Sequence, residues 1–95
     1  MIDLSIILVN YNTTSLLADA IESVVQHTKQ LDYEIIVVDN ASTDDVLSLQ
    51  TKFPAIKLKI LSQNVGFGRA NNAGVEEANG RNILKQMIGV VVSIL

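Results

Sequence analysis

Polar side chains that could bind a ligand gather at three places in the sequence, each directly after a run of apolar residues. Carboxylates, amides and hydroxyls can pair with the hydroxyls and ring nitrogens of a nucleoside, and an arginine beside glycines suits a phosphate. Ligands of open parallel sheets bind outside the carboxyl ends of the strands. The pattern therefore predicts one site built from three loops: Asn10, Tyr11 and Asn12; Asp39, Asn40, Ser42 and Asp44; Asn64, Gly66, Phe67, Gly68 and Arg69.

The two carboxylates of the second loop each have two interpretations. Asp39 ends the second apolar run, where it could accept from a ribose hydroxyl or from N3–H of uracil or thymine, or else cap its own loop. Asp44 stands at the predicted start of a helix, where it could border the ligand or satisfy the backbone amides of the helix. Capping is the commoner role of an aspartate in that place.

The third loop, residues 64–69, leads into the start of another predicted helix. Glycines let the backbone approach a ligand, helix-start amides attract anions and Arg69 adds a cation, so a diphosphate could sit there. It is no Walker loop, since no Gly-Lys-Ser/Thr follows, and no G-x-G-x-x-G fingerprint, since the third glycine is missing. The alternative is a tight turn with a surface arginine.

Tyr11 and His27 have weaker claims to a role. Tyr11 could stack on a base or pack against the helix that follows it. His27 is the only histidine, and with no cysteine and no second histidine in the chain a metal-binding or catalytic role for it is not favoured.

Hydrophobic patterns predict the elements that hold the three loops. Residues 4–10 and 34–39 are typical of strands buried on both faces, and 57–61 of a strand nearer an edge. Residues 14–27 predict an amphipathic helix, because apolar residues recur at helical spacing. These are Leu17, Ile21 and Val25, with Leu16, Ala20 and Val24 beside them.

Two more helices and a fourth strand follow. Ser42 and Asp45 resemble a capping box before a short helical stripe that ends at Pro54. Residues 67–79 predict a helix so rich in glycine and alanine that it must pack close to a neighbour, with Gly80 as its C-terminal stop. Residues from 82 on begin like a strand and continue as an apolar tail.

This order, β-α-β-α-β-α-β, predicts a single α/β domain with a mainly parallel sheet of three or four strands and right-handed crossovers. The 95 residues, 48% of them hydrophobic, suffice for one small domain. A net charge of −3 with scattered basic residues argues against nucleic acid as a partner. No signal peptide is expected, and no run reaches the roughly 18 apolar residues of a membrane span.

Three segments together resemble family 2 glycosyltransferases of the GT-A type. Residues 5–12 (SIILVNYN) are similar to the opening strand and loop of that family, residues 34–44 (EIIVVDNASTD) to its second strand and Asp-rich loop, and residues 64–74 (NVGFGRANNAG) to its third motif, in the style of rhamnosyltransferase-like members. The resemblance runs from about residue 3 to about residue 84, with a divergent apolar tail at 85–95.

The resemblance implies the Rossmann-like N-terminal half of a GT-A fold and a nucleotide-sugar site for inverting transfer. Asp39 would hold the base or ribose of a UDP- or dTDP-sugar, Asn10 and Tyr11 would line the base pocket, and Asp44 would border it. Asn64, Gly66 and Arg69 would lie near the ribose-diphosphate. Asn12 and Asn40 complete the set of expected nucleotide-binding residues. A full-length member would also need Mg²⁺ or Mn²⁺.

The family's next motif, an apolar strand ending in Asp-x-Asp that holds the metal, is not found, since no Asp or Glu follows Glu77. No residue of this chain is therefore assigned as a metal ligand or as the catalytic base, and the chain is expected to be a truncated, inactive homologue. The alternatives are a binding or assembly module that forms a homodimer through its tail, and a nucleotidyltransferase. A cytoplasmic, membrane-peripheral location is expected by analogy with the family.

Overall fold

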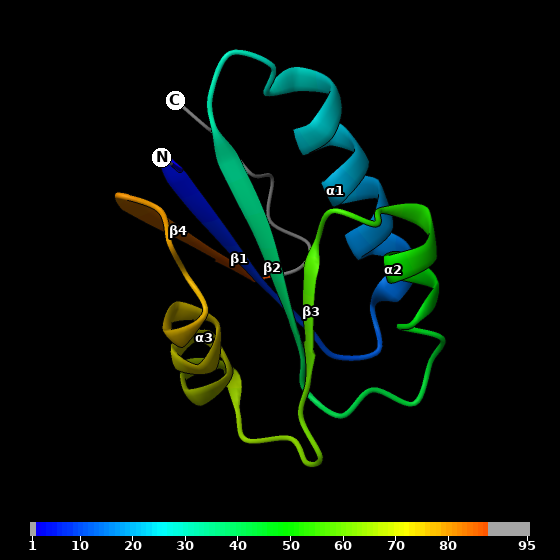
Figure 1. The fold of residues 1–95 in the computed structure, drawn as a ribbon. Helices are drawn as coiled ribbons and strands as arrows, with labels where there is room; N and C mark the ends of the chain where they lie inside the picture. The colour runs from blue at the N-terminus through cyan, green and yellow to red at the C-terminus, as the bar shows by residue number, and fades with distance from the viewer. Residues whose placement is uncertain (1, 88–95) are drawn as a thin grey trace.

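The computed structural model describes the backbone of residues 2–87 and the side chains of residues 2–83. Four strands and three helices alternate along the chain, as Figure 1 shows. Their bounds are β1 Leu4–Asn10, α1 Thr14–His27, β2 Tyr33–Asp39, α2 Ser48–Lys52, β3 Lys57–Ile60, α3 Phe67–Glu76 and β4 Asn82–Met87. The predicted α/β class and order of elements are confirmed.

All four strands are parallel and lie in the order β3-β2-β1-β4. In the central pair, Leu4 is opposite Tyr33 and Asn10 is opposite Asp39, so both strands end at the same level. β3 lies at one edge, as predicted, and β4 at the other. Three strand ends that carry predicted site residues are therefore neighbours.

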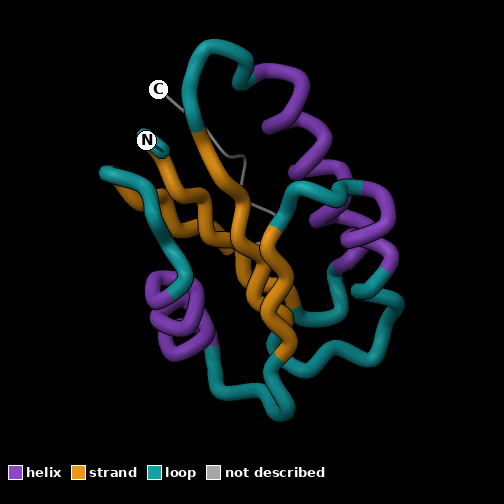
Figure 2. Tube along the Cα trace, in the orientation of Figure 1, coloured by secondary structure: helices purple, strands orange, loops and turns teal. Residues whose placement is uncertain are grey.

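Helices cover both faces of the sheet, as Figures 1 and 2 show, with α1 and α2 on one side and α3 on the other. The first face packs Ile6, Leu8 and Val37 under Leu17 and Ile21. The opposite face packs alternate residues of the same strands under α3. The apolar runs are continuous because β1 and β2 are buried on both faces.

The small residues of α3 serve the close approach that the sequence predicts. A Cβ added at Gly74 would lie 2.5 Å from Cγ2 of Ile7 and 3.1 Å from Cγ2 of Val38. Real Cβ atoms do not sit that close to a neighbour, so a larger residue would push the helix off the sheet.

The stop of α3 differs from the prediction. The helix ends at Glu76 rather than at residue 79, and Gly80 is not its C-terminal cap. The amides of Asn79 and Gly80 donate instead to Glu34 and Ser5, which draws the chain onto the sheet. Gly80 is needed because a Cβ there would lie 2.5 Å from the backbone nitrogen of Ser5.

Two further predictions about the helices were wrong. The hydroxyl of Ser42 accepts from the first loop and makes no capping box, and α2 begins only at Ser48. In α1 the buried stripe runs through Thr14, Leu17, Ile21 and Val24, whereas Leu16 and Val25 are exposed. The predicted dimer contact falls on the divergent tail, residues 85–95, of which residues 88–95 lie outside the described residues.

Candidate functional site

The loops that follow β1, β2 and β3 meet at the carboxyl edge of the sheet, at the lower end of the molecule in Figure 1. The side-chain amide of Asn10 donates to Oδ1 of Asp39 at 3.0 Å, which joins the first loop to the second. The side-chain amide of Asn40 donates to Oδ1 of Asn64 at 2.9 Å, and its Oδ1 accepts from the backbone of Val65. The three predicted groups of residues are thus tied into one polar surface.

Asp39 lies at the centre of this surface and is only 1% exposed. Its Oδ1 accepts from Asn10, and its Oδ2 accepts from the backbone N–H of Ser42 at 3.0 Å. The second bond is the loop cap that the sequence left open as an alternative. In this conformation Asp39 therefore organises the loops, and its carboxylate faces protein donors.

Asn12 bridges the first loop to the second. Its Oδ1 accepts from the backbone N–H of Thr43 at 2.7 Å, from the hydroxyl of Thr43 at 3.2 Å and from the N–H of Asp44 at 3.3 Å. In the other direction, the backbone N–H of Asn12 donates to Oγ of Ser42 at 2.8 Å. Asn12 has a φ of 53°, a left-handed conformation that asparagine tolerates better than most residues.

Asp44 caps a helix, but the helix is α1 and not the one that follows it in the chain. Its two carboxylate oxygens accept from the backbone N–H of Thr14 at 3.0 Å and from the Thr14 hydroxyl at 2.8 Å. The N-cap residue Thr13 makes no side-chain capping bond, so Asp44 supplies a missing acceptor and a favourable charge at the helix start.

The third loop presents different groups. Gly66 has a φ of 86° and precedes α3 with no side chain to cap it. Arg69 is exposed on the first turn of that helix and pairs with no acidic side chain among the described residues. Oδ1 of Asn64 accepts from the N–H of Gly66 at 2.9 Å, which holds the loop in this turn. A cation and helix-start amides therefore face solvent at this point.

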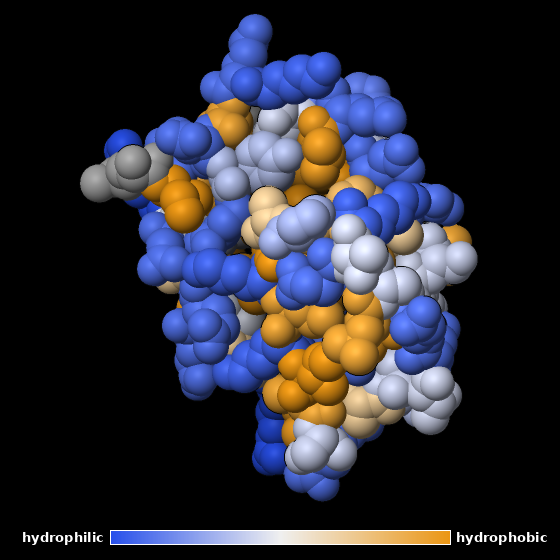
Figure 3. Space-filling view, turned by 45° about the vertical axis from the view of Figure 1, so that its right-hand side comes forward, coloured by the Kyte–Doolittle hydropathy of each residue, from blue (hydrophilic) through white to orange (hydrophobic). Residues whose placement is uncertain are grey.

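Tyr11 is 51% exposed and so does not pack beneath the next helix. Other exposed apolar side chains near this edge are Leu47, Ile60 and Phe67. Figure 3 shows apolar surface gathered toward the lower end of the molecule, among polar surroundings. Tyr11 thus adds an exposed ring to the polar loops of the site.

A divalent cation does not fit the described part of the chain. Among residues 2–87 no three His, Asp or Glu side chains cluster so as to hold a metal ion. The two nearest carboxylates, Asp39 and Asp44, already use both oxygens on protein donors. No metal-dependent step is therefore assigned to these residues.

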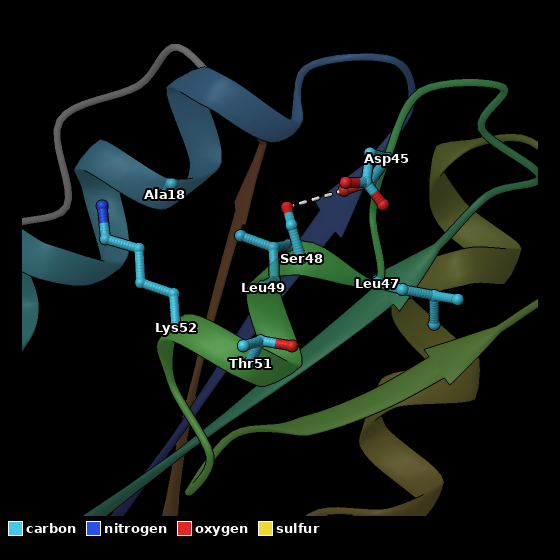
Figure 4. A pocket seen from close by; sticks show the side chains of 7 residues that line it. All are labelled: Ala18, Asp45, Leu47, Ser48, Leu49, Thr51 and Lys52. Atoms are coloured by element: carbon cyan, nitrogen blue, oxygen red, sulfur yellow. Dashed lines mark hydrogen bonds between the residues drawn. The ribbon is translucent and has the colours of Figure 1, made fainter.

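A hollow of about 470 Å³ lies between α1 and α2, close to the second loop (Figure 4). Its polar groups come from α2 and the segment before it, where the hydroxyl of Ser48 donates to the backbone carbonyl of Asp45 at 2.7 Å. It shares none of the predicted site residues. The lining side chains are Ala18, Asp45, Leu47, Ser48, Leu49, Thr51 and Lys52.

Sequence reasoning missed Glu34, which sits at the opposite, amino edge of the sheet. Its carboxylate accepts from the Ser5 hydroxyl and the Asn79 backbone N–H, both at 2.6 Å, and lies 2.9 Å from Nζ of Lys57. Burial raises its pKa, but these donors and the lysine charge outweigh burial and lower the pKa to about 2. Its position in an apolar run gave no sign that its partners would come from three other segments.

The sequence matches the family model described as glycosyl transferase family 2 over residues 5–87. It is 35% identical over 83 residues to the glycosyltransferase YwdF of Bacillus subtilis, covering 85% of this chain and 30% of that protein. It is 40% identical over 81 residues to the glycosyltransferase alr2836 of a Nostoc species, covering 81% of this chain and 25% of that protein. The chain thus spans about a quarter to a third of these relatives.

Solved structures share the fold. TarS of S. aureus in complex with UDP superposes with a TM-score of 0.82 and 25% identity over 92% of this chain and 27% of TarS. A mannosyltransferase of Pyrobaculum calidifontis, in complex with GDP-Man and Mn²⁺, has a TM-score of 0.70 at 23% identity, covering 84% of this chain and 25% of its own. No helix within residues 2–87 is long and apolar enough to cross a membrane. The four-stranded parallel sheet is the Rossmann-like sheet of a GT-A fold, and the chain belongs to glycosyl transferase family 2.

Proposed function

We propose that this chain binds the nucleotide part of a UDP- or dTDP-sugar at the carboxyl edge of its sheet, as the donor-binding front of an inverting glycosyltransferase. The observation that carries the proposal is the meeting of three loops through the bonds Asn10–Asp39 and Asn40–Asn64. A nucleotide needs a base pocket and an anion site within one molecule's length, and these loops offer both. TarS structures with UDP and with UDP-GlcNAc support the choice of ligand class.

The roles divide by exposure. Tyr11 offers a ring face for stacking on the base. Asn64, Gly66 and Arg69 receive the diphosphate, where the amides at the start of α3 and the guanidinium supply positive charge. The loops are held in place by Asn10, Asn12, Asn40 and Asp44. Asp39 recognises N3–H of a pyrimidine base once a protein donor has left one of its carboxylate oxygens.

For these 95 residues, we propose binding without transfer. Among the described residues, no three His, Asp or Glu side chains cluster so as to hold a cation on the diphosphate. No residue is assigned as the base for an acceptor hydroxyl. The sequence after Glu77 adds no acidic residue. Sugar nucleotides of this class are cytosolic, so the proposal places the protein at the cytoplasmic side.

A titration of the ¹⁵N-labelled protein with UDP, dTDP and GDP tests the proposal. UDP or dTDP should shift the amides of residues 10–12, 39–44 and 64–70, and GDP should shift them less. Arg69→Ala should weaken UDP binding about tenfold, because a charge-assisted bond to phosphate is lost. Arg81→Ala is the matched control, since Arg81 is exposed and lies at the amino edge beside Asp3. Shifts confined to the amino edge, or equal losses in the two variants, would contradict the proposal.

A further inference from the structure

The acceptor at the centre of the proposed site is covered by the chain itself. Asp39 is 1% exposed, and the N–H of Ser42 occupies its Oδ2 while Asn10 occupies its Oδ1. A carboxylate oxygen can accept a second bond, but burial this complete leaves a ligand no path to Oδ2 until the loop that carries the Ser42 amide moves away.

Ser42 and Thr43 are held mainly by contacts at the surface. Oγ of Ser42 accepts from the N–H of Asn12, and Oδ1 of Asn12 accepts from Thr43 and Asp44. These four bonds are solvent-exposed, where water competes for each partner, so they break at low cost. A fifth and longer bond, from the side-chain amide of Asn10 to Oγ of Ser42 at 3.4 Å, is partly buried.

The covering segment is short and has a defined point at each end. Before it, Ala41 has a φ of 63°, a left-handed conformation that disfavours alanine. After it, Asp44 is anchored on Thr14 at the start of α1 by two hydrogen bonds. Only Ser42 and Thr43 lie between the strained residue and the anchor.

We propose that Ser42 and Thr43, held by Asn12, form a latch over Asp39 that must open before a nucleotide base can bind. This rests on the proposed function, because it regulates that same site. On opening, N3–H of a uracil or thymine ring takes the place of the Ser42 amide on Oδ2, and Asn10 stays on Oδ1. Asn12 then governs affinity through the latch and does not contact the base.

The latch predicts the sign of a mutational effect. A protein that binds ligand only in its open fraction has an apparent affinity lowered by that fraction, so loosening the latch tightens binding. A residue that contacts ligand directly has the opposite sign, because its loss weakens binding. Asn12 therefore distinguishes the two roles.

The experiment uses wild type, Asn12→Gly, Ser42→Ala and the control Ser48→Ala, with hydrogen exchange and UDP titration followed by NMR. Glycine keeps the left-handed backbone at position 12 while removing Oδ1. Ser48 matches Ser42 in type and in the exposure of its bond, but its hydroxyl donates to Asp45 outside the latch. Asn12→Gly and Ser42→Ala should speed amide exchange at Ser42 and Thr43 and lower the Kd for UDP about fivefold, with Ser48→Ala unchanged.

Two results would overturn the latch. Unchanged exchange at Ser42 and Thr43 in Asn12→Gly would show that Asn12 does not hold the segment. Faster exchange together with a raised Kd would make Asn12 a ligand group. If UDP shifts the amide resonances of none of these proteins, the proposed function fails, and the latch over the base site fails with it. If UDP binds to the wild type and either result above is found, only the latch is refuted.

Discussion

Ala41 stands in the left-handed region, with a φ of 63°, between two residues whose side chains build the site. A Cβ in that region crowds the following carbonyl, and the cost is about 1–2 kcal/mol for residues other than glycine. The loop accepts this cost because Asn40 bonds to the third loop and Ser42 bonds to the first. A local backbone conformation is thus imposed by contacts on both sides of it.

Ala41→Gly should raise the free energy of unfolding by about 0.5–1 kcal/mol, because relief of the strained φ exceeds the extra entropy of glycine in the unfolded chain. Urea denaturation followed by far-UV circular dichroism measures the change. Ala55→Gly is the control at an exposed position whose φ is not positive, and it should lower stability slightly. A loss in both variants would show that the left-handed conformation at position 41 carries no strain.

The lowered pKa of Glu34 predicts that the free energy of unfolding falls as the pH is lowered. Its folded pKa, about 2, lies below the ordinary value of 4.5, so between these values the unfolded chain binds more protons than the folded one. Its contribution is therefore complete above about pH 4.5 and is lost as the pH falls toward 2.

Glu34→Gln should lower the free energy of unfolding at pH 7 by about 2 kcal/mol. This figure allows for solvent screening, because the Lys57 side chain is 45% exposed. The deficit should shrink between pH 4.5 and pH 2, which urea melts at several pH values measure. Glu22→Gln is the matched control, since its partner among the described residues, Lys52, lies 3.8 Å away at the surface. A deficit that is constant with pH would contradict the lowered pKa.

Among the elements, α3 depends most on the size of one residue. Gly74 faces Ile7 and Val38 with no room for a methyl group, whereas a Cβ added at Gly68, in the first turn of the same helix, would meet no atom within 4 Å. Helix propensity favours alanine at both positions, so any difference between them measures packing alone.

Gly74→Ala should cost about 1–3 kcal/mol of unfolding free energy because it overpacks the contact with β1 and β2. Gly68→Ala should gain about 0.5–1 kcal/mol, the ordinary benefit of alanine in a helix. Thermal and urea melts of the two variants give the comparison. If both variants gain stability, α3 does not lie as close to the sheet as described.

The start of α1 supplies another element-scale prediction, since its cap comes from residue 44, thirty positions away in the chain. Asp44→Ala should cost about 1 kcal/mol, the usual effect of losing an N-terminal cap. Asp44→Asn keeps an acceptor oxygen and should cost less, and Asp45→Ala, which makes no such contact, should cost little. Urea melts test the order. Equal losses at positions 44 and 45 would rule out a specific cap.

At the scale of the whole molecule, β1 and β2 belong to both hydrophobic cores, while β3 and β4 are the outer strands of the sheet that the described residues form. The central strands should therefore open only with global unfolding, and the edge strands should open more easily. Native-state hydrogen exchange should show the slowest amides at residues 6–9 and 35–38 and faster exchange at residues 57–60. Equal protection across β2 and β3 would contradict this difference.

Apolar patterns were enough to predict the strands, the parallel sheet and the place where the loops meet, because burial on two faces makes most residues of β1 and β2 apolar. They could not predict which donors the polar side chains would find. Asp44 caps α1 instead of its own helix, Ser42 bonds to the first loop, and Gly80 fits against Ser5, because all three contacts join segments far apart in the sequence. Nothing in the local spacing of these residues encodes such partners.

The anchored carboxylate of Glu34 and the three-loop surface stand at opposite ends of the same strands, a full strand length apart. Engineering can therefore treat the two ends separately. Substitutions at the amino end, for example around Lys57 or Asn79, offer a way to stabilise the protein against heat or acid without changing ligand selectivity. A mutant library that seeks binding of new sugar nucleotides can be confined to the other end.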